Sequence, residues 1–144
     1  MTIFPMIQPE ISVTVERLPL AREIAWDFEK DLPVLKNGEP VICEGAEAVA
    51  VWAWNALSTV RYRHEIFSWD YGCELENLVG QSYSADTKKA EAVRYVREAL
   101  MVNPYITEVN DIRVEFDGKG LLTVSCRIRT IYGELSIQRR GANV

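Results

Sequence analysis

Three carboxylates that lie close together in the sequence are the residues best suited to chemistry. Asp70, Glu74 and Glu76 follow the single histidine, His64, in a stretch rich in aromatic side chains. Two carboxyl groups about 5 Å apart, or about 6.5–9.5 Å apart, can hydrolyse a glycosidic bond when an apolar setting keeps one of them protonated. Asp70 with Glu74 or Glu76 is therefore a candidate catalytic pair for a peptidoglycan hydrolase.

The same carboxylates also have a structural explanation. The apolar residues between Cys73 and Val79 predict a short helix that Gly80 ends. Acidic residues are stabilised at a helix start by the helix dipole, so Asp70 and Glu74 fit capping positions. The net charge of −5 is also unfavourable for an enzyme that must approach an anionic cell wall. We therefore expect no catalytic residues and no enzymatic activity.

Other patterns that could bind or react are weak. His64 beside Glu65 forms at most a minimal acid–base pair, because no serine or cysteine stands out as a nucleophile. Trp52 could stack on a sugar, but its place on an apolar helix stripe predicts a core position. The chain contains neither GxGxxG nor GxxxxGK[ST], so nucleotide binding has no support. We expect no cofactor.

The cysteines do not predict a metal site. Cys43, Cys73 and Cys126 are far apart, lack CxxC spacing and have one histidine to join them. Three reduced and mostly buried thiols, in a protein made in a cytoplasm, are the expected state.

Length and composition predict one soluble domain. The chain has 144 residues, of which 48% are hydrophobic and 26% charged, as in ordinary globular proteins. Its negative net charge argues against nucleic acid or an anionic membrane as the main partner. The first ten residues, MTIFPMIQPE, lack a basic region followed by an apolar run, so we expect no signal peptide. No apolar run approaches the roughly 20 residues that cross a bilayer.

The first half of the chain divides into an arm, a β region and a helix. Prolines and the alternation Ile11, Val13, Val15 predict an extended arm over residues 1–22, followed by one domain over residues 23–144. Alternating Ile24, Trp26 and Phe28 predict a strand with those three side chains buried. Asn37-Gly38 predicts a type I′ hairpin turn. A helix is expected over about 46–59; its apolar stripe leaves out Val51 and Trp54, so we expect a second covered face.

The second half predicts one more helix and a C-terminal β region. Ser84 can cap a helix over about 85–102, which Pro104 stops. A three-residue loop at 118–120 keeps the apolar faces of the next two strands together. It pairs Phe116 with Leu122, Val114 with Val124 and Ile112 with Cys126, and sets Asp111 opposite Arg127. A final short strand is expected over Leu135–Gln138.

These elements give an α+β fold class. We expect a small antiparallel or mixed sheet packed against two main helices, with an extended N-terminal arm and a C-terminal β-hairpin.

Three segments carry a family resemblance. They are NALSTVRYRHEIFSWDYGCELENLVGQ (55–81), REALMVNPYITEV (97–109) and TIYGEL (130–135). Together they resemble the gene-twenty-five-like phage baseplate wedge family, in its branch from Gram-positive prophages and phage-tail-like bacteriocins. The resemblance runs from about Ile24 to Ile137. The word lysozyme that often accompanies the family name does not by itself indicate activity.

The resemblance implies a structural role. Members of that family surround the tail tube at the top of the baseplate and template the first sheath ring, offering strands to the terminal arms of sheath subunits. The implied partners are sheath protein, baseplate wedge and hub proteins, and neighbouring copies in a ring. The implied location is a virion or phage-tail-like particle assembled in the bacterial cytoplasm.

The resemblance also implies two partner-binding segments. The family contacts its wedge partners through a Glu-Pro-Arg tripeptide after the second helix, and this chain has Asn103, Pro104 and Tyr105 there. Only the proline matches. The predicted sheath-binding edge is the last strand, where Leu135 and Ile137 alternate with Ser136 and Gln138, and Arg139 and Arg140 follow as charges that protect an edge. A generic adaptor without sheath contact is the remaining alternative.

Overall fold

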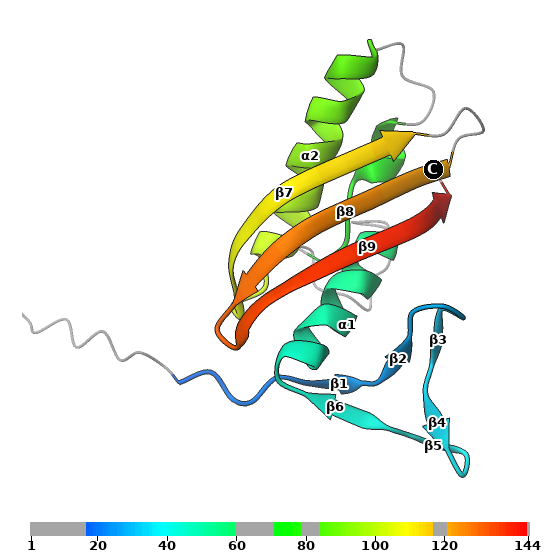
Figure 1. Ribbon diagram of the computed structural model, residues 1–144, viewed down its shortest axis with the longest axis vertical. Coiled ribbons are helices and arrows are strands. Elements are labelled where there is room, and N and C mark those ends of the chain that lie inside the picture. Colours follow the sequence, from blue (N-terminus) through cyan, green and yellow to red (C-terminus); the bar gives the residue numbers. More distant parts are fainter. Residues whose placement is uncertain (1–16, 60–70, 79–83, 117–120, 144) are drawn as a thin grey trace, which may run out of the picture.

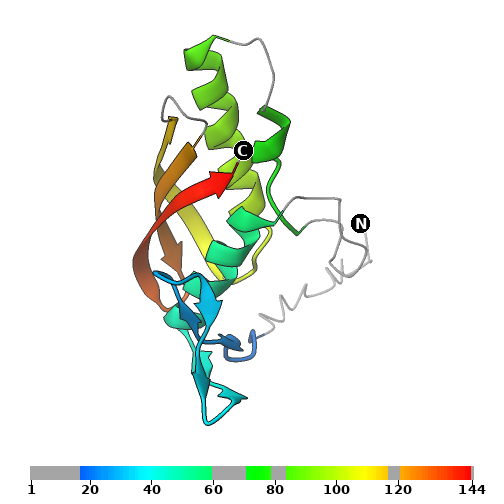
Figure 2. The same cartoon turned by 90° about the vertical axis from the view of Figure 1, so that its right-hand side faces the viewer.

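The computed structural model describes residues 17–59, 71–78, 84–116 and 121–143. It is a two-layer α+β structure, which confirms the predicted fold class. A three-stranded sheet forms one layer and two helices cover one of its faces, while a group of short strands extends from one end (Figure 1). The view turned by 90° shows the sheet from its edge, with the helices as a separate layer beside it (Figure 2).

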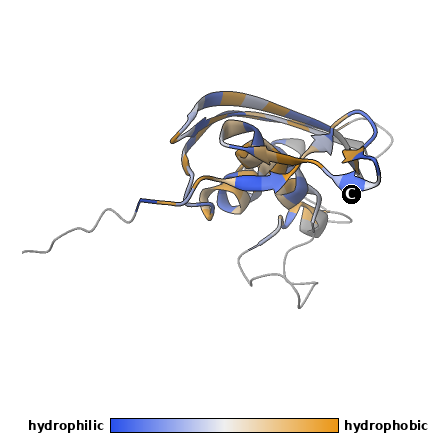
Figure 3. Ribbon diagram, turned by 90° about the horizontal axis from the view of Figure 1, so that it is seen from below, coloured by the Kyte–Doolittle hydropathy of each residue, from blue (hydrophilic) through white to orange (hydrophobic). Residues whose placement is uncertain are grey.

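The sheet is antiparallel, in the order β7-β8-β9. Its strands are β7 (Ile106–Phe116), β8 (Leu121–Thr130) and β9 (Gly133–Asn143). Hydrophobic and hydrophilic residues alternate along parts of the strands (Figure 3), and one face of the sheet packs on the helices. The buried residues on that face include Val114, Val124, Cys126, Ile128 and Ile137.

The two long helices lie close to the ranges that the sequence predicts. α1 spans Ala46–Ser58 and α2 spans Ala85–Met101. The Ser84 side chain accepts a hydrogen bond from the Thr87 N–H, which caps α2 as predicted. The predicted short helix is a single 3-10 turn, η1 (Leu75–Leu78).

Both long helices bury apolar residues against the sheet and each other. Val96, Ala99 and Leu100 of α2 are almost completely buried. In α1, Val51 and Trp54 are buried as well as Val49, Ala53 and Leu57 of the main stripe, which confirms the second covered face. The predicted core position of Trp52 is confirmed only in part, because Trp52 is half-buried at the margin of the core. Its ring packs edge-on against Tyr71, with ring centroids 5.6 Å apart.

The region before α1 is a chain of small antiparallel pairs. The strands are β1 (Arg22–Ile24), β2 (Trp26–Asp27), β3 (Leu32–Pro33), β4 (Leu35–Lys36), β5 (Glu39–Pro40) and β6 (Ile42–Glu44). β1 pairs with β6, β2 with β3, and β4 with β5. Asn37 and Gly38 join β4 to β5 with φ of 54° and 79°, as the predicted type I′ turn requires.

The predicted buried face of the first strand is wrong. Ile24 and Phe28 are 41% and 40% exposed, whereas Ala25 is 7% exposed. The extended run is interrupted at Ala25, whose N–H donates to Val41 O and whose carbonyl accepts from Val34 N–H. Because the chain bends there to pair with two segments, side-chain alternation does not continue from β1 to β2.

The predicted register of β7 and β8 is confirmed at Phe116–Leu122 and Val114–Val124. The predicted pairing of Ile112 with Cys126 is replaced by a bulge between Asn110 and Arg113, where Asp111 has a φ of 51°. The predicted placement of Asp111 opposite Arg127 is also wrong, because Asn110 pairs with Arg127. Arg127 still forms an ion pair with Asp111, at 3.4 Å.

The predicted last strand is too short. β9 continues to Asn143 and pairs with β8 along its length. Arg139 and Arg140 therefore lie within the strand, because Gly141 interrupts the register with a bulge instead of ending it.

Other predictions lie outside the described residues: the N-terminal arm over residues 1–16, residues 61–70, and the loop at 118–120. All three cysteines are buried, and burial raises the pKa of the Cys126 thiol to about 11. Within the described part of the chain, neither helix is long and apolar enough to span a bilayer.

Candidate functional site: the free edge of β9

The sheet has two outer strands, and they differ in regularity. The outer strand β7 carries two irregularities, one between Ile106 and Glu108 and one between Asn110 and Arg113. Bulges of this kind protect an edge against further strand pairing. β9 is regular from Gly133 to Arg140. It is therefore the edge better suited to accept another strand.

Contacts of β8 identify which β9 residues direct backbone groups outward. The Thr107 hydroxyl donates to Arg129 O of β8, and the N–H of Ile131, just after β8, donates to Tyr105 O, just before β7. Arg129 and Ile131 therefore direct backbone groups toward the β7 side. These directions alternate along an antiparallel strand. Ile128 and Thr130 consequently face β9, where Leu135 and Gly133 are their partners.

It follows that Ser136 and Gln138 direct their backbone groups away from β8. No backbone hydrogen bond from outside the sheet reaches them among the described residues. Their side chains are exposed, whereas Ile137 is buried and Leu135 is half-buried. The alternation expected for Leu135–Gln138 is thus present, and the exposed residues are also those with unpaired backbone groups.

Arg139 does not have the protective surface position that the sequence suggested. It lies on the helix side of the sheet and is 8% exposed. Its guanidinium donates to Trp54 O and to Asp31 Oδ2, both at 3.2 Å. Its Nε has no hydrogen-bond partner among the described residues. The carboxylate of Asp31 is therefore the main group that offsets the cost of burying the guanidinium charge.

Asp31 joins these contacts into one cluster. Its Oδ1 accepts from the indole N–H of Trp54 at 2.8 Å and of Trp26 at 2.9 Å. The hydrogen bond from Trp54 is the largest cause that lowers the pKa of Asp31, and the hydrogen bond from Trp26 and the charge of Arg139 add to it. Burial lowers the pKa of Arg139 despite the ion pair.

Sequence reasoning missed this cluster. Asp31 lies between β2 and β3 with a φ of 54°, and Arg139 is 108 residues away. The one available signal was the alternation of side chains along β9, because residues two positions apart, such as Ile137 and Arg139, lie on the same face of a strand.

A groove lies beside the free edge on the helix side. It contains a cavity of about 210 Å³ lined by Phe28, Ala50 and Trp54 and by residues 136–138 of β9. The Phe28 and Trp54 rings are 4.8 Å apart and tilted by 57°. An adjoining hollow adds the carboxylates of Glu29 and Asp31. The groove is apolar at its base and acidic at one side.

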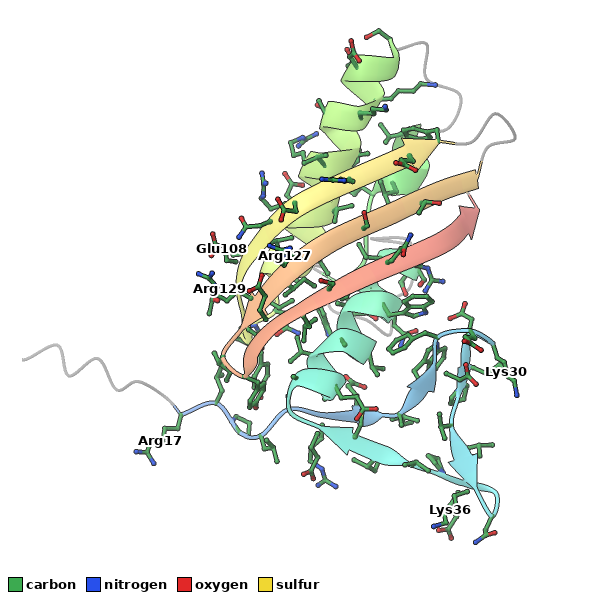
Figure 4. All side chains as sticks on the ribbon, viewed as in Figure 1. Arg17, Lys30, Lys36, Glu108, Arg127 and Arg129 are labelled. Carbon is green, nitrogen blue, oxygen red and sulfur yellow. The ribbon has the colours of Figure 1, made fainter. Side chains whose placement is uncertain are left out.

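The opposite face of the sheet is polar. Ion pairs join Glu108 to Arg129 at 3.0 Å and Arg127 to Glu134 at 3.1 Å. Figure 4 shows Glu108, Arg127 and Arg129 together on the face turned away from the helices. These exposed pairs contribute little stability, but they make the face hydrophilic.

The Asn103-Pro104-Tyr105 junction is mostly an internal structure. Asn103 is 6% exposed, and its side-chain oxygen accepts from Tyr105 N–H at 2.8 Å. The Tyr105 hydroxyl donates to Pro19 O at 2.6 Å, and its ring stacks on Tyr132. The Tyr132 hydroxyl accepts from Ala21 N–H. The two tyrosines thus hold residues 19–21.

The outward part of the junction is its apolar surface. Pro104 is exposed, and Met101 and Val102 just before it are 43% and 41% exposed. These three side chains, unlike Asn103 and Tyr105, are available to a partner.

The candidate catalytic carboxylates are not brought into a described site. Asp70 and the side chain of Glu76 lie outside the described residues, and Glu74 is half-buried just before η1. No cluster of three or more potential metal ligands occurs in the parts of the chain that the structure describes.

Comparison with solved structures shows a shared fold. A crystal structure of a putative tail lysozyme from Geobacter sulfurreducens aligns with a TM-score of 0.54 and 20% identity, covering 65% of this chain and 86% of that one. At this identity the likeness concerns the fold alone.

Comparison of sequences identifies the family. The phage-like element PBSX protein XkdS of Bacillus subtilis (strain 168) is 30% identical over 142 residues, covering 96% of this chain and 95% of that protein. The model of the contractile injection system sheath initiator family matches residues 22–133. This chain therefore belongs to the contractile injection system sheath initiators, a family of structural components of phage-type tails.

Proposed function

We propose that this protein is a non-enzymatic baseplate component on which the first ring of a contractile sheath forms. The observation that carries the proposal is the regular edge of β9 from Gly133 to Arg140, which pairs only with β8 among the described residues. An incoming terminal arm of a sheath subunit forms backbone hydrogen bonds with Ser136 and Gln138 and extends the sheet by one strand.

This arrangement answers a physical problem of polymer initiation. In a polymer whose subunits complete one another's sheets, the first subunit has no neighbour to supply a strand. Each added hydrogen bond contributes only about 0.5–1.5 kcal/mol. A ring of copies around the tail tube raises the effective concentration of such weak sites, so that several arms are bound together.

We further propose that the junction after α2 contacts a wedge or hub protein. Asn103 and Tyr105 shape it, because their polar groups are used within the chain. Pro104, Met101 and Val102 then form the contacting surface. This assignment keeps the position that the family resemblance implies and replaces an ion pair by apolar contact.

Nucleation of purified sheath protein tests the main proposal. Sheath polymerisation is followed by light scattering with and without this protein. A shortened lag that scales with the amount of protein added supports initiation. A lag unchanged at equimolar protein would contradict it.

A further inference from the structure

The β9 edge and the groove beside it form one continuous surface. The cavity lined by Phe28, Ala50 and Trp54 also contacts residues 136–138, which include the residues with outward backbone groups. Any strand that pairs with this edge places alternate side chains on the helix side of the sheet. One of those side chains therefore lies over the cavity.

The cavity has the size and the lining for a single large apolar side chain. Its volume is about 210 Å³, and its lining includes the apolar residues Phe28, Ala50, Trp54 and Ile137. Phe28 is 40% exposed although its ring packs on Trp54. An apolar side chain inserted here covers exposed aromatic surface of Phe28.

The adjoining hollow adds a charge preference. It shares Phe28, Trp54 and Gln138 with the cavity and contains Glu29 and Asp31. Asp31 is already paired with Arg139, whereas Glu29 forms no ion pair within the described residues. Along a strand, side chains on one face recur every second residue. A basic residue two positions from the apolar one therefore lies beside Glu29.

We propose that the groove selects the arm that pairs with β9. Its occupant is an extended segment of a sheath subunit with a large apolar side chain in the Phe28–Trp54 cavity and a lysine or arginine two residues away, near Glu29. This inference rests on the proposed function and adds a specificity determinant to it.

The test compares variants of the full chain for binding to purified full-length sheath protein. Ala50→Phe fills the cavity and leaves the β9 backbone unchanged. Glu47→Phe adds the same side chain at an exposed position of α1 outside the groove. Ser136→Pro removes one outward N–H and leaves unchanged the Phe28, Ala50 and Trp54 side chains that line the cavity opposite β9. Thermal unfolding verifies that each variant is folded.

The expected results separate the contribution of the cavity to sheath binding from that of the β9 backbone. Ala50→Phe weakens sheath binding about tenfold or more, because the apolar side chain is displaced, while Glu47→Phe binds like the wild type. Phe28→Ala repeats the test by removing a cavity wall, should Ala50→Phe fail to fold.

Three outcomes would overturn the inference in different ways. If Ser136→Pro weakens binding and both cavity variants do not, the edge functions without the cavity. If Ser136→Pro binds normally, the proposed function itself is wrong. Self-association that Ala50→Phe abolishes would assign the groove to a second copy of this chain.

Charge reversal tests the basic residue. Glu29→Lys should weaken sheath binding, with a larger loss at low salt than at high salt. Lys30→Glu, the neighbouring position outside the groove lining, is the control with the opposite change of charge. If Glu29→Lys and the wild type bind sheath protein equally tightly at low salt, the groove has no preference for a basic residue.

Discussion

The Arg139 guanidinium lies over the indole ring of Trp54, with its central carbon 4.6 Å from the ring centroid. Arg139 belongs to β9, Trp54 to α1, and their shared partner Asp31 to the turn between β2 and β3. The contact therefore joins the proposed binding edge, β9, to α1 and to the β2–β3 turn, which line its groove. A substitution at Asp31 should affect the positions of all three segments.

The first prediction concerns Asp31→Asn. The substitution removes the carboxylate that pairs with a buried guanidinium whose Nε is already without a partner. We expect the free energy of unfolding to fall by about 1–2 kcal/mol, less than for a fully buried pair because the Asp31 side chain is 50% exposed. Urea denaturation measures the difference. Glu29→Gln, at an exposed neighbouring position, should change stability little; an equal loss there would contradict a specific role for Asp31.

The second prediction concerns pH. Asp31 has a lowered pKa in the folded chain, so its contribution is fully present above its unfolded pKa of about 3.9. It is lost as the pH falls through the folded value. The stability difference between wild type and Asp31→Asn should thus be constant near neutrality and shrink below about pH 4. A difference that stays constant down to the acid unfolding transition would show that the charge of Asp31 is not its source.

The third prediction concerns Tyr105→Phe. It keeps the stack on Tyr132 but removes the hydrogen bond to Pro19 O. Residues 17–21 should open more often, and trypsin should cleave faster after Arg17. Global stability should fall by no more than about 0.5–1.5 kcal/mol. Unchanged cleavage would mean that the hydroxyl does not hold this segment.

The fourth prediction is the absence of cell-wall hydrolysis. The shared fold with a putative tail lysozyme makes this worth measuring directly. Purified protein should not clear a suspension of cell walls, because the net charge of −5 opposes contact with an anionic wall. Clearing that disappears in Asp70→Asn, and remains in the control Asp86→Asn, would establish an enzyme.

The sequence predicted those features that depend on local pattern. Apolar periodicity and Ser84 located both helices, Asn37-Gly38 located a hairpin, and strand alternation located the exposed positions Ser136 and Gln138. Each of these depends on neighbours within a few residues.

The missed features depend on residues far apart in the chain. Alternation at Ile24, Trp26 and Phe28 did not reveal the break at Ala25, which forms because two later segments bond to it. Arg139 was interpreted as a surface charge because its partner Asp31 is distant in sequence. The groove could not be predicted, since its lining comes from α1, β9 and the turn after β2, which are far apart in the sequence.

The most direct test of the account is the fraction of sheathed tails in particles that carry Ser136→Pro. The substitution removes an outward N–H and leaves the ladder to β8 intact, whereas deleting β9 would also remove Ile137 and Arg139 from the core. Ser136→Ala, which keeps the N–H, is the matched control. We expect electron micrographs to show baseplates with bare tubes for Ser136→Pro and normal sheaths for Ser136→Ala. Normally sheathed tails in the proline variant, with its incorporation into the baseplate verified, would contradict the role of the β9 edge.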